Sequence, residues 1–125
     1  MNMREPREPT EYQKISSDIE KKLAGADLTA DDLFRGHLHY GDKFNDPIGI
    51  YIVRRKKGYE IYYLNIHGIE SVKKLSTEDE VVFQIIYDGI TDFSYRAGGY
   101  NSRKRALELL KMIDADHYNE IIKQG

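Results

Sequence analysis

The eight residues from Tyr59 to Ile66 constrain the fold most, because they alternate as a β-strand and are largely apolar on both faces. The two faces consist of Tyr59, Ile61 and Tyr63, and of Tyr62, Leu64 and Ile66. Such a strand is typical of the centre of a sheet or of a sheet covered on both sides. Two more segments have the pattern of strands. Residues 48–53 precede the turn at Gly58, and residues 69–75 follow the strand from Tyr59 to Ile66. We therefore expect a small antiparallel sheet.

Segments with helical periodicity precede and follow the predicted strands along the chain. Residues 10–25 repeat apolar side chains at helical intervals, and a capped helix spans 77–93. A short helical turn near Thr29, a possible strand at 37–40, and two further helices at 102–113 and 114–123 complete the expected order. The sequence predicts an α+β fold with an N-terminal helix, three or four strands, and two or three C-terminal helices packed on the sheet.

The length of 125 residues suits a single domain over 1–125, in which 1–9 form a loose arm. Cysteine is absent, which excludes disulfides and thiolate metal sites. Neither an apolar run long enough to span a membrane nor the apolar core of a signal peptide is present, so we expect a cytoplasmic protein that does not bind membranes.

Charge is unevenly distributed along the chain. The segment from Ser76 to Phe93 carries five acids and no Lys or Arg, although the net charge of the chain is only −2. Glu78, Asp79 and Glu80 are explained by the start of a helix, where Thr77 and Glu80 form a capping box. The remaining acids lie on one helical stripe and are expected to be hydrated. We predict that this stripe binds a partner; its residues are Glu80, Gln84, Tyr87, Asp88 and Asp92.

Catalysis finds little support in the sequence. Cys nucleophiles, a G-x-S-x-G elbow and a P-loop are all absent, so we expect neither an enzyme nor a cofactor. His37 and His39 would share one face of a strand, and Asp42 or Asp46 could add an oxygen ligand. We favour exposed or hydrogen-bonded histidines, and keep a small metal-dependent enzyme as the weaker alternative.

The run from Arg54 to Lys57 lies beside several tyrosines, a pattern that can hold single-stranded nucleic acid. We favour a solvated hairpin tip, because the isoelectric point near 6.1 argues against a nucleic-acid module. A small nucleic-acid-binding module is therefore the first alternative to a protein partner, ahead of the metal-dependent enzyme.

Three short motifs lie between residues 58 and 122. Gly68 and Glu70 form a G-x-E motif, and Arg103 and Arg105 are closely spaced arginines. A helix start comprises Thr77, Asp79, Glu80 and the run Val81-Val82-Phe83. With these motifs, residues 58–122 resemble a family of small immunity proteins from bacterial polymorphic-toxin and contact-dependent inhibition systems, immunity protein 63, which has a G-x-E motif, a similar helix start and paired arginines. The chain departs from the pattern at Ile66-His67 and in having no Trp.

This resemblance implies a protein that binds and neutralises one cognate toxin domain, without catalysis or a cofactor. Toxins of this kind are often nucleases with basic clefts, which an acidic surface would attract.

Overall fold

The computed structural model describes residues 10–124 as ten elements. The helices and strands are α1 (Thr10–Ala24), α2 (Ala30–Phe34), β1 (Leu38–Tyr40), β2 (Gly49–Arg55), β3 (Gly58–Asn65), β4 (Gly68–Leu75), α3 (Glu78–Gly98), the 3-10 turn η1 (Gly99–Asn101), α4 (Ser102–Ile113) and α5 (Ala115–Gln124). This order confirms the α+β prediction. The predicted loose arm at 1–9 lies outside the described residues.

The sheet is mixed, with strand order β1-β2-β3-β4. The pairs β2–β3 and β3–β4 are antiparallel as predicted, and β3 lies inside the sheet. The prediction of a wholly antiparallel sheet is wrong at β1, which runs parallel to β2 and pairs Leu38 with Ile50. Because β1 has only three residues, residues 41–48 suffice to bring the chain back to the start of its neighbour.

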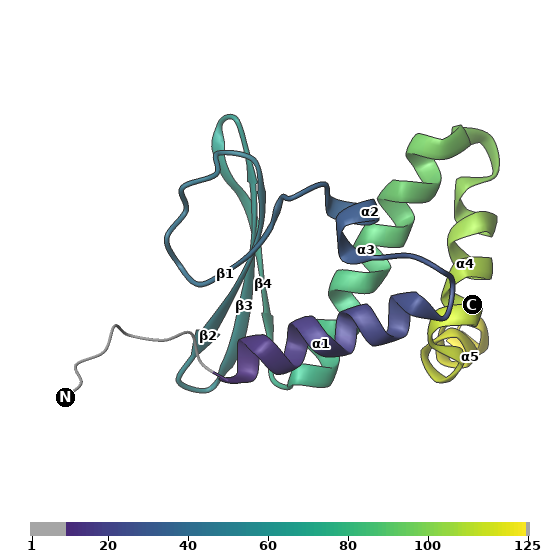
Figure 1. Cartoon of the computed structure of the whole chain (residues 1–125), viewed down its shortest axis with the longest axis horizontal. Coiled ribbons are helices and arrows are strands. Elements are labelled where there is room, and N and C mark those ends of the chain that lie inside the picture. Colours follow the sequence, from purple (N-terminus) through teal and green to yellow (C-terminus); the bar gives the residue numbers. More distant parts are fainter. Residues whose placement is uncertain (1–9, 125) are drawn as a thin grey trace.

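All helices lie on one side of the sheet (Figure 1), and the core lies between them and the strands. The long helix α3 contributes five fully or almost fully buried apolar residues, which pack with Ile52 of β2 and Ile61 of β3. They are Val81, Val82, Ile85, Ile86 and Ile90. α1, α2 and α4 also pack against α3. The broad apolar arc of this helix is therefore explained by neighbours on several sides.

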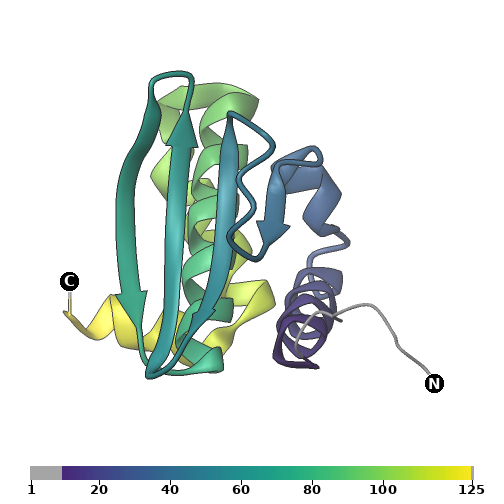
Figure 2. The same cartoon turned by 90° about the vertical axis from the view of Figure 1, so that its left-hand side faces the viewer.

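The other face of the sheet, here the outer face, carries an aromatic cluster. The ring of Tyr51 lies 4.7 Å from that of His39 and 4.7 Å from that of Phe44, and Phe44 lies 5.0 Å from Tyr62. Residues 41–48, which include Phe44, lie on this side of the sheet (Figure 1). Figure 2 shows the outer face directly, with no helix in front of the strands. The sheet is therefore covered by helices on one side and only partly by a loop on the other.

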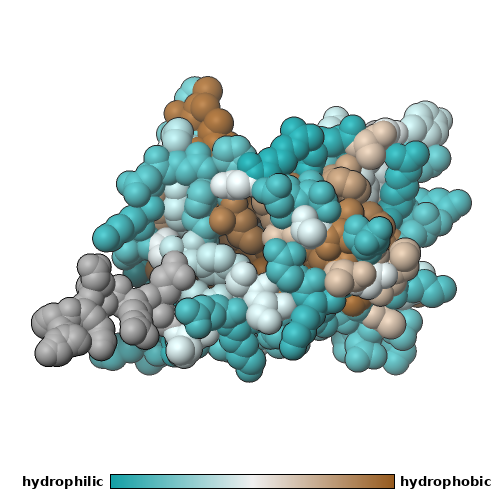
Figure 3. Space-filling model, in the orientation of Figure 1, coloured by the Kyte–Doolittle hydropathy of each residue, from teal (hydrophilic) through white to brown (hydrophobic). Residues whose placement is uncertain are grey.

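Strand β4 is the open edge of the sheet and is exposed along nearly its whole length. Ile66, in the turn before it, is 72% exposed, and Ile69 is 54% exposed. Figure 3 shows hydrophobic atoms at the upper end of the sheet, where β3 turns into β4. Lys73 and Lys74 lie on the same strand and supply the charge that commonly protects an open edge from pairing.

Candidate functional site

The five predicted partner-binding residues all lie on α3, spaced so that they share one side of the helix. Glu80 and Asp92 are exposed, whereas Gln84, Tyr87 and Asp88 are partly buried. We call this set the α3 stripe. That this stripe binds a partner stays a prediction; within the protein, each of its acids already has a hydrogen-bonding partner.

Glu80 begins the stripe and also caps its helix. Its Oε1 accepts hydrogen bonds from the backbone N–H groups of Ser76 (2.8 Å) and Thr77 (3.1 Å). The hydroxyl of Thr77 accepts in return from the Glu80 N–H (3.1 Å). This reciprocal pair is the predicted capping box. Because the donors are uncharged amides, these contacts supply no counter-charge to the carboxylate.

Asp88 is less hydrated than predicted, because β3 approaches it from the sheet. The Tyr63 hydroxyl donates to Asp88 Oδ2, and the Gln84 amide donates to Oδ1 over 2.8 Å. Burial raises the pKa of Tyr63 above its ordinary value, and the hydrogen bond to Asp88 and the charge of that carboxylate raise it further. Tyr63 therefore stays a neutral donor, and neither it nor Gln84 supplies a counter-charge to Asp88.

Asp92 differs from the other two acids, because Arg96 pairs with it one turn further along α3. The Arg96 Nε lies 2.8 Å from Asp92 Oδ2, and its Nη2 donates to the Leu33 carbonyl of α2 over 3.0 Å. Arg96, which supplies this counter-charge, lies three residues after Phe93, the end of the segment that contains no Lys or Arg. The net charge of the stripe thus comes mainly from Glu80 and Asp88.

Two tyrosines lie on the same side of α3 as the acids. Tyr87 is partly buried and stacks on Phe83 at a ring distance of 5.7 Å. Tyr95, seven residues after Asp88, is 65% exposed and was not predicted as part of the stripe. Its spacing of two helical turns was the available signal, but the predicted helix ended at Phe93. The stripe therefore combines carboxylates with large amphipathic rings, which protein interfaces favour.

In the basic hairpin that suggested nucleic-acid binding, both arginines pair with acids of the same chain. Arg55 Nε lies 2.6 Å from Glu60 Oε1, and Arg55 Nη2 donates to the Tyr62 hydroxyl over 2.9 Å. Arg54 Nε lies 3.7 Å from Glu11. These contacts neutralise part of the basic run and hold the guanidinium groups against the sheet, which weakens their use as phosphate ligands.

His37, immediately before β1, and His39, within it, converge on one carboxylate. Asp46 Oδ2 lies 2.7 Å from His37 Nδ1 and 2.7 Å from His39 Nε2. These hydrogen bonds, that of His37 first, lower the pKa of Asp46 to about 2. The hydrogen bond with Asp46 also raises the pKa of His37. The sequence offered Asp42 and Asp46 as the acid beside these histidines, and the structure places Asp46 there. Asp42 Oδ2 instead lies 3.8 Å from Arg55 Nη1.

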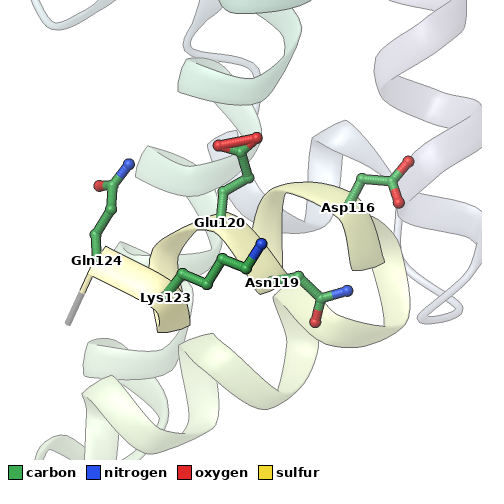
Figure 4. A pocket seen from close by; sticks show the side chains of 5 residues that line it. All are labelled: Asp116, Asn119, Glu120, Lys123 and Gln124. Atoms are coloured by element: carbon green, nitrogen blue, oxygen red, sulfur yellow. The ribbon is translucent and has the colours of Figure 1, made fainter.

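A hollow on α5 is lined by polar side chains but forms no site. Its lining comes entirely from one helix, as Figure 4 shows: Asp116, Asn119, Glu120, Lys123 and Gln124. The side chains spread apart along the helix and do not converge on a common point (Figure 4). We read this surface as a solvated helix face.

No protein-family model, curated protein or solved structure matches this chain. The resemblance to immunity protein 63 therefore stays a prediction. Among the helices of residues 10–124, none is long and apolar enough to cross a membrane.

Proposed function

We propose that this protein binds a basic protein domain through the α3 stripe and blocks it, as an immunity protein neutralises a bacterial toxin. The observation that carries the proposal is the hydrogen bonding of the Glu80 and Asp88 carboxylates. Both carboxylates are held in place by uncharged donors, the Ser76 and Thr77 amides and the Tyr63 hydroxyl. These donors add no positive charge, and because they already fix the two carboxylates, little side-chain freedom is lost on binding, which favours electrostatic recognition.

The neighbouring aromatic residues support the same surface. Tyr95 is exposed two helical turns beyond Asp88, and Tyr87, the residue before Asp88, is partly exposed. Charges draw a basic partner to the surface, and tyrosine side chains then supply buried area at a small cost in side-chain entropy. A nuclease toxin, whose cleft binds phosphates, is the partner class that best fits such a surface.

The proposal predicts tight binding to the toxin domain encoded immediately upstream of this protein's gene. We expect a 1:1 complex with a Kd of about 10 nM or tighter, measured by calorimetry. Co-expression should also restore growth to cells that produce the toxin domain. A toxin domain from an unrelated system is the control. Absence of both binding and growth protection would refute the proposed function.

A further inference from the structure

We propose that His37, His39 and Asp46 form a binding site for a divalent transition-metal ion, with Zn²⁺ as the best fit. One potential ligand atom from each residue lies within 4.8 Å of the other two. His37 and His39 lie two residues apart at β1, so their side chains leave the same face of the strand. Residues 41–48 then bring Asp46 back to meet them. The proposed ion would lie at the β1 side of the outer face.

The donor set matches the chemistry of zinc. Imidazole nitrogen and carboxylate oxygen bind Zn²⁺ at about 2.0–2.2 Å, which sets ligand atoms about 3.3 Å apart in a tetrahedron. Each imidazole nitrogen now lies 2.7 Å from Asp46 Oδ2. An outward shift of about 0.6 Å per contact would admit the ion. The His37 side chain is 50% exposed and the His39 side chain is 31% exposed, so both have room for this movement.

Contacts outside the ligand set hold Asp46 in place. Its Oδ1 accepts from the Ile48 N–H over 3.1 Å, which leaves Oδ2 for the histidines. Its backbone N–H donates to the Tyr51 hydroxyl over 2.7 Å, and that hydroxyl donates to the Asp46 carbonyl over 3.0 Å. Tyr51 is buried and also stacks on the His39 ring. Such outer contacts orient metal ligands and raise affinity.

Gly49 keeps the space behind the ligands open. A Cβ there would lie 2.8 Å from the His37 carbonyl, 3.3 Å from Asp46 Oδ2 and 3.3 Å from the His39 ring. Any side chain at this position would press on all three ligand residues. The close approach of β2 to the histidines therefore depends on glycine.

Three protein ligands leave one position of a tetrahedral zinc ion for water or for a group from a partner. To coordinate, each imidazole must present an unprotonated nitrogen, His37 through Nδ1 and His39 through Nε2, with the ring proton on the opposite nitrogen. The bound ion would replace the two hydrogen bonds to Asp46 and fasten residues 41–48 to β1. The site lies away from α3 and is independent of the proposed partner surface.

The test is titration of the EDTA-dialysed full chain with CoCl2, followed by visible absorption, and with ZnCl2, followed by calorimetry. We expect one ion per chain, the intense absorption of four-coordinate Co²⁺, and a Zn²⁺ Kd of about 1 μM or tighter. His39→Ala and Asp46→Asn should each weaken Zn²⁺ binding at least 100-fold. His67→Ala removes an exposed histidine from a different turn and should leave binding unchanged.

Circular dichroism shows whether each variant is folded before its Zn²⁺ binding is compared with that of the wild type. Asp46→Asn retains an oxygen for the Ile48 amide, so it decides the question if His39→Ala unfolds. A wild-type Zn²⁺ Kd weaker than about 100 μM, at least a hundredfold above the expected value, would overturn the site. Equal losses in His67→Ala and Asp46→Asn would overturn it as well.

Discussion

Replacing Asp114 with Ala is expected to lower the free energy of unfolding by about 2–3 kcal/mol. Asp114 is a buried acid at the junction of α4 and α5, where its Oδ2 lies 2.9 Å from Lys22 Nζ of α1 and 2.7 Å from His117 Nδ1. Its Oδ1 accepts from the His117 N–H over 3.3 Å, as expected of a helix cap. The variant loses the cap and leaves Lys22, one third exposed, without its partner. Urea unfolding measures the loss.

Asp116→Ala is the matched control, because it removes an exposed acid from the first turn of the same helix. That change should cost less than about 1 kcal/mol. If the two variants lose equal stability, Asp114 does not join α1 to the C-terminal helices as described.

The Asp114 contacts also predict a dependence of stability on pH. Burial opposes ionisation of this carboxyl, but hydrogen bonds from Lys22 and His117 outweigh burial and hold its pKa below the ordinary value. Because the folded-state pKa is the lower one, the stabilisation is complete above the unfolded-state pKa of about 4 and is lost as the pH falls through the folded-state pKa. The unfolding free energies of wild type and Asp114→Ala should therefore converge in acid.

Replacing Gly58 with Ala should lower the free energy of unfolding by about 3 kcal/mol. Gly58 begins β3 with a φ of +142°, a conformation that L-residues rarely adopt. A Cβ there would lie only 2.5 Å from the backbone carbonyl oxygen of Leu75, at the end of β4. The clash is with backbone, so β4 and the start of α3 would have to move. Thermal and urea unfolding would both report the loss.

Gly68→Ala separates the two causes of this loss. Gly68 has a φ of +109°, and an added Cβ would meet nothing within 4 Å. Backbone strain alone should therefore cost about 1 kcal/mol at Gly68. A loss at Gly58 no larger than the loss at Gly68 would show that β4 moves aside easily.

Local patterns in the sequence predicted the elements of this fold well. The capping box of Thr77 and Glu80 depends on residues three apart, and the structure contains it. The alternation of β3 likewise placed that strand inside the sheet. In both cases the controlling interactions are close in sequence or repeat with a fixed period, so the residues themselves carry the information.

Contacts between distant segments were harder to predict. The hydrogen bond from Tyr63 to Asp88 joins a strand to a helix 25 residues later, so helical periodicity alone made Asp88 appear hydrated. The parallel pairing of β1 depends on the path of residues 41–48, which contain no regular repeat. The same path selects Asp46 over Asp42 as the neighbour of the two histidines. The sequence supplied both candidates but not the fold of the loop.

The α3 stripe makes a quantitative prediction about how fast a partner binds. Reversing the charges of Asp88 and Asp92 with Asp88→Lys and Asp92→Lys should make a basic partner encounter repulsion at the stripe. Tyr63→Phe is the matched control, because it removes the hydrogen bond to Asp88 and keeps the charge of the stripe. Circular dichroism of both proteins would confirm that they are folded before binding is compared.

The most direct test is the association rate of these proteins with the upstream-encoded toxin domain, measured by stopped-flow fluorescence at several salt concentrations. We expect the double reversal to slow association at least about tenfold at low salt and to weaken its salt dependence, whereas Tyr63→Phe stays near the wild-type rate. An unchanged rate and salt dependence in the reversed protein would contradict binding through the α3 stripe.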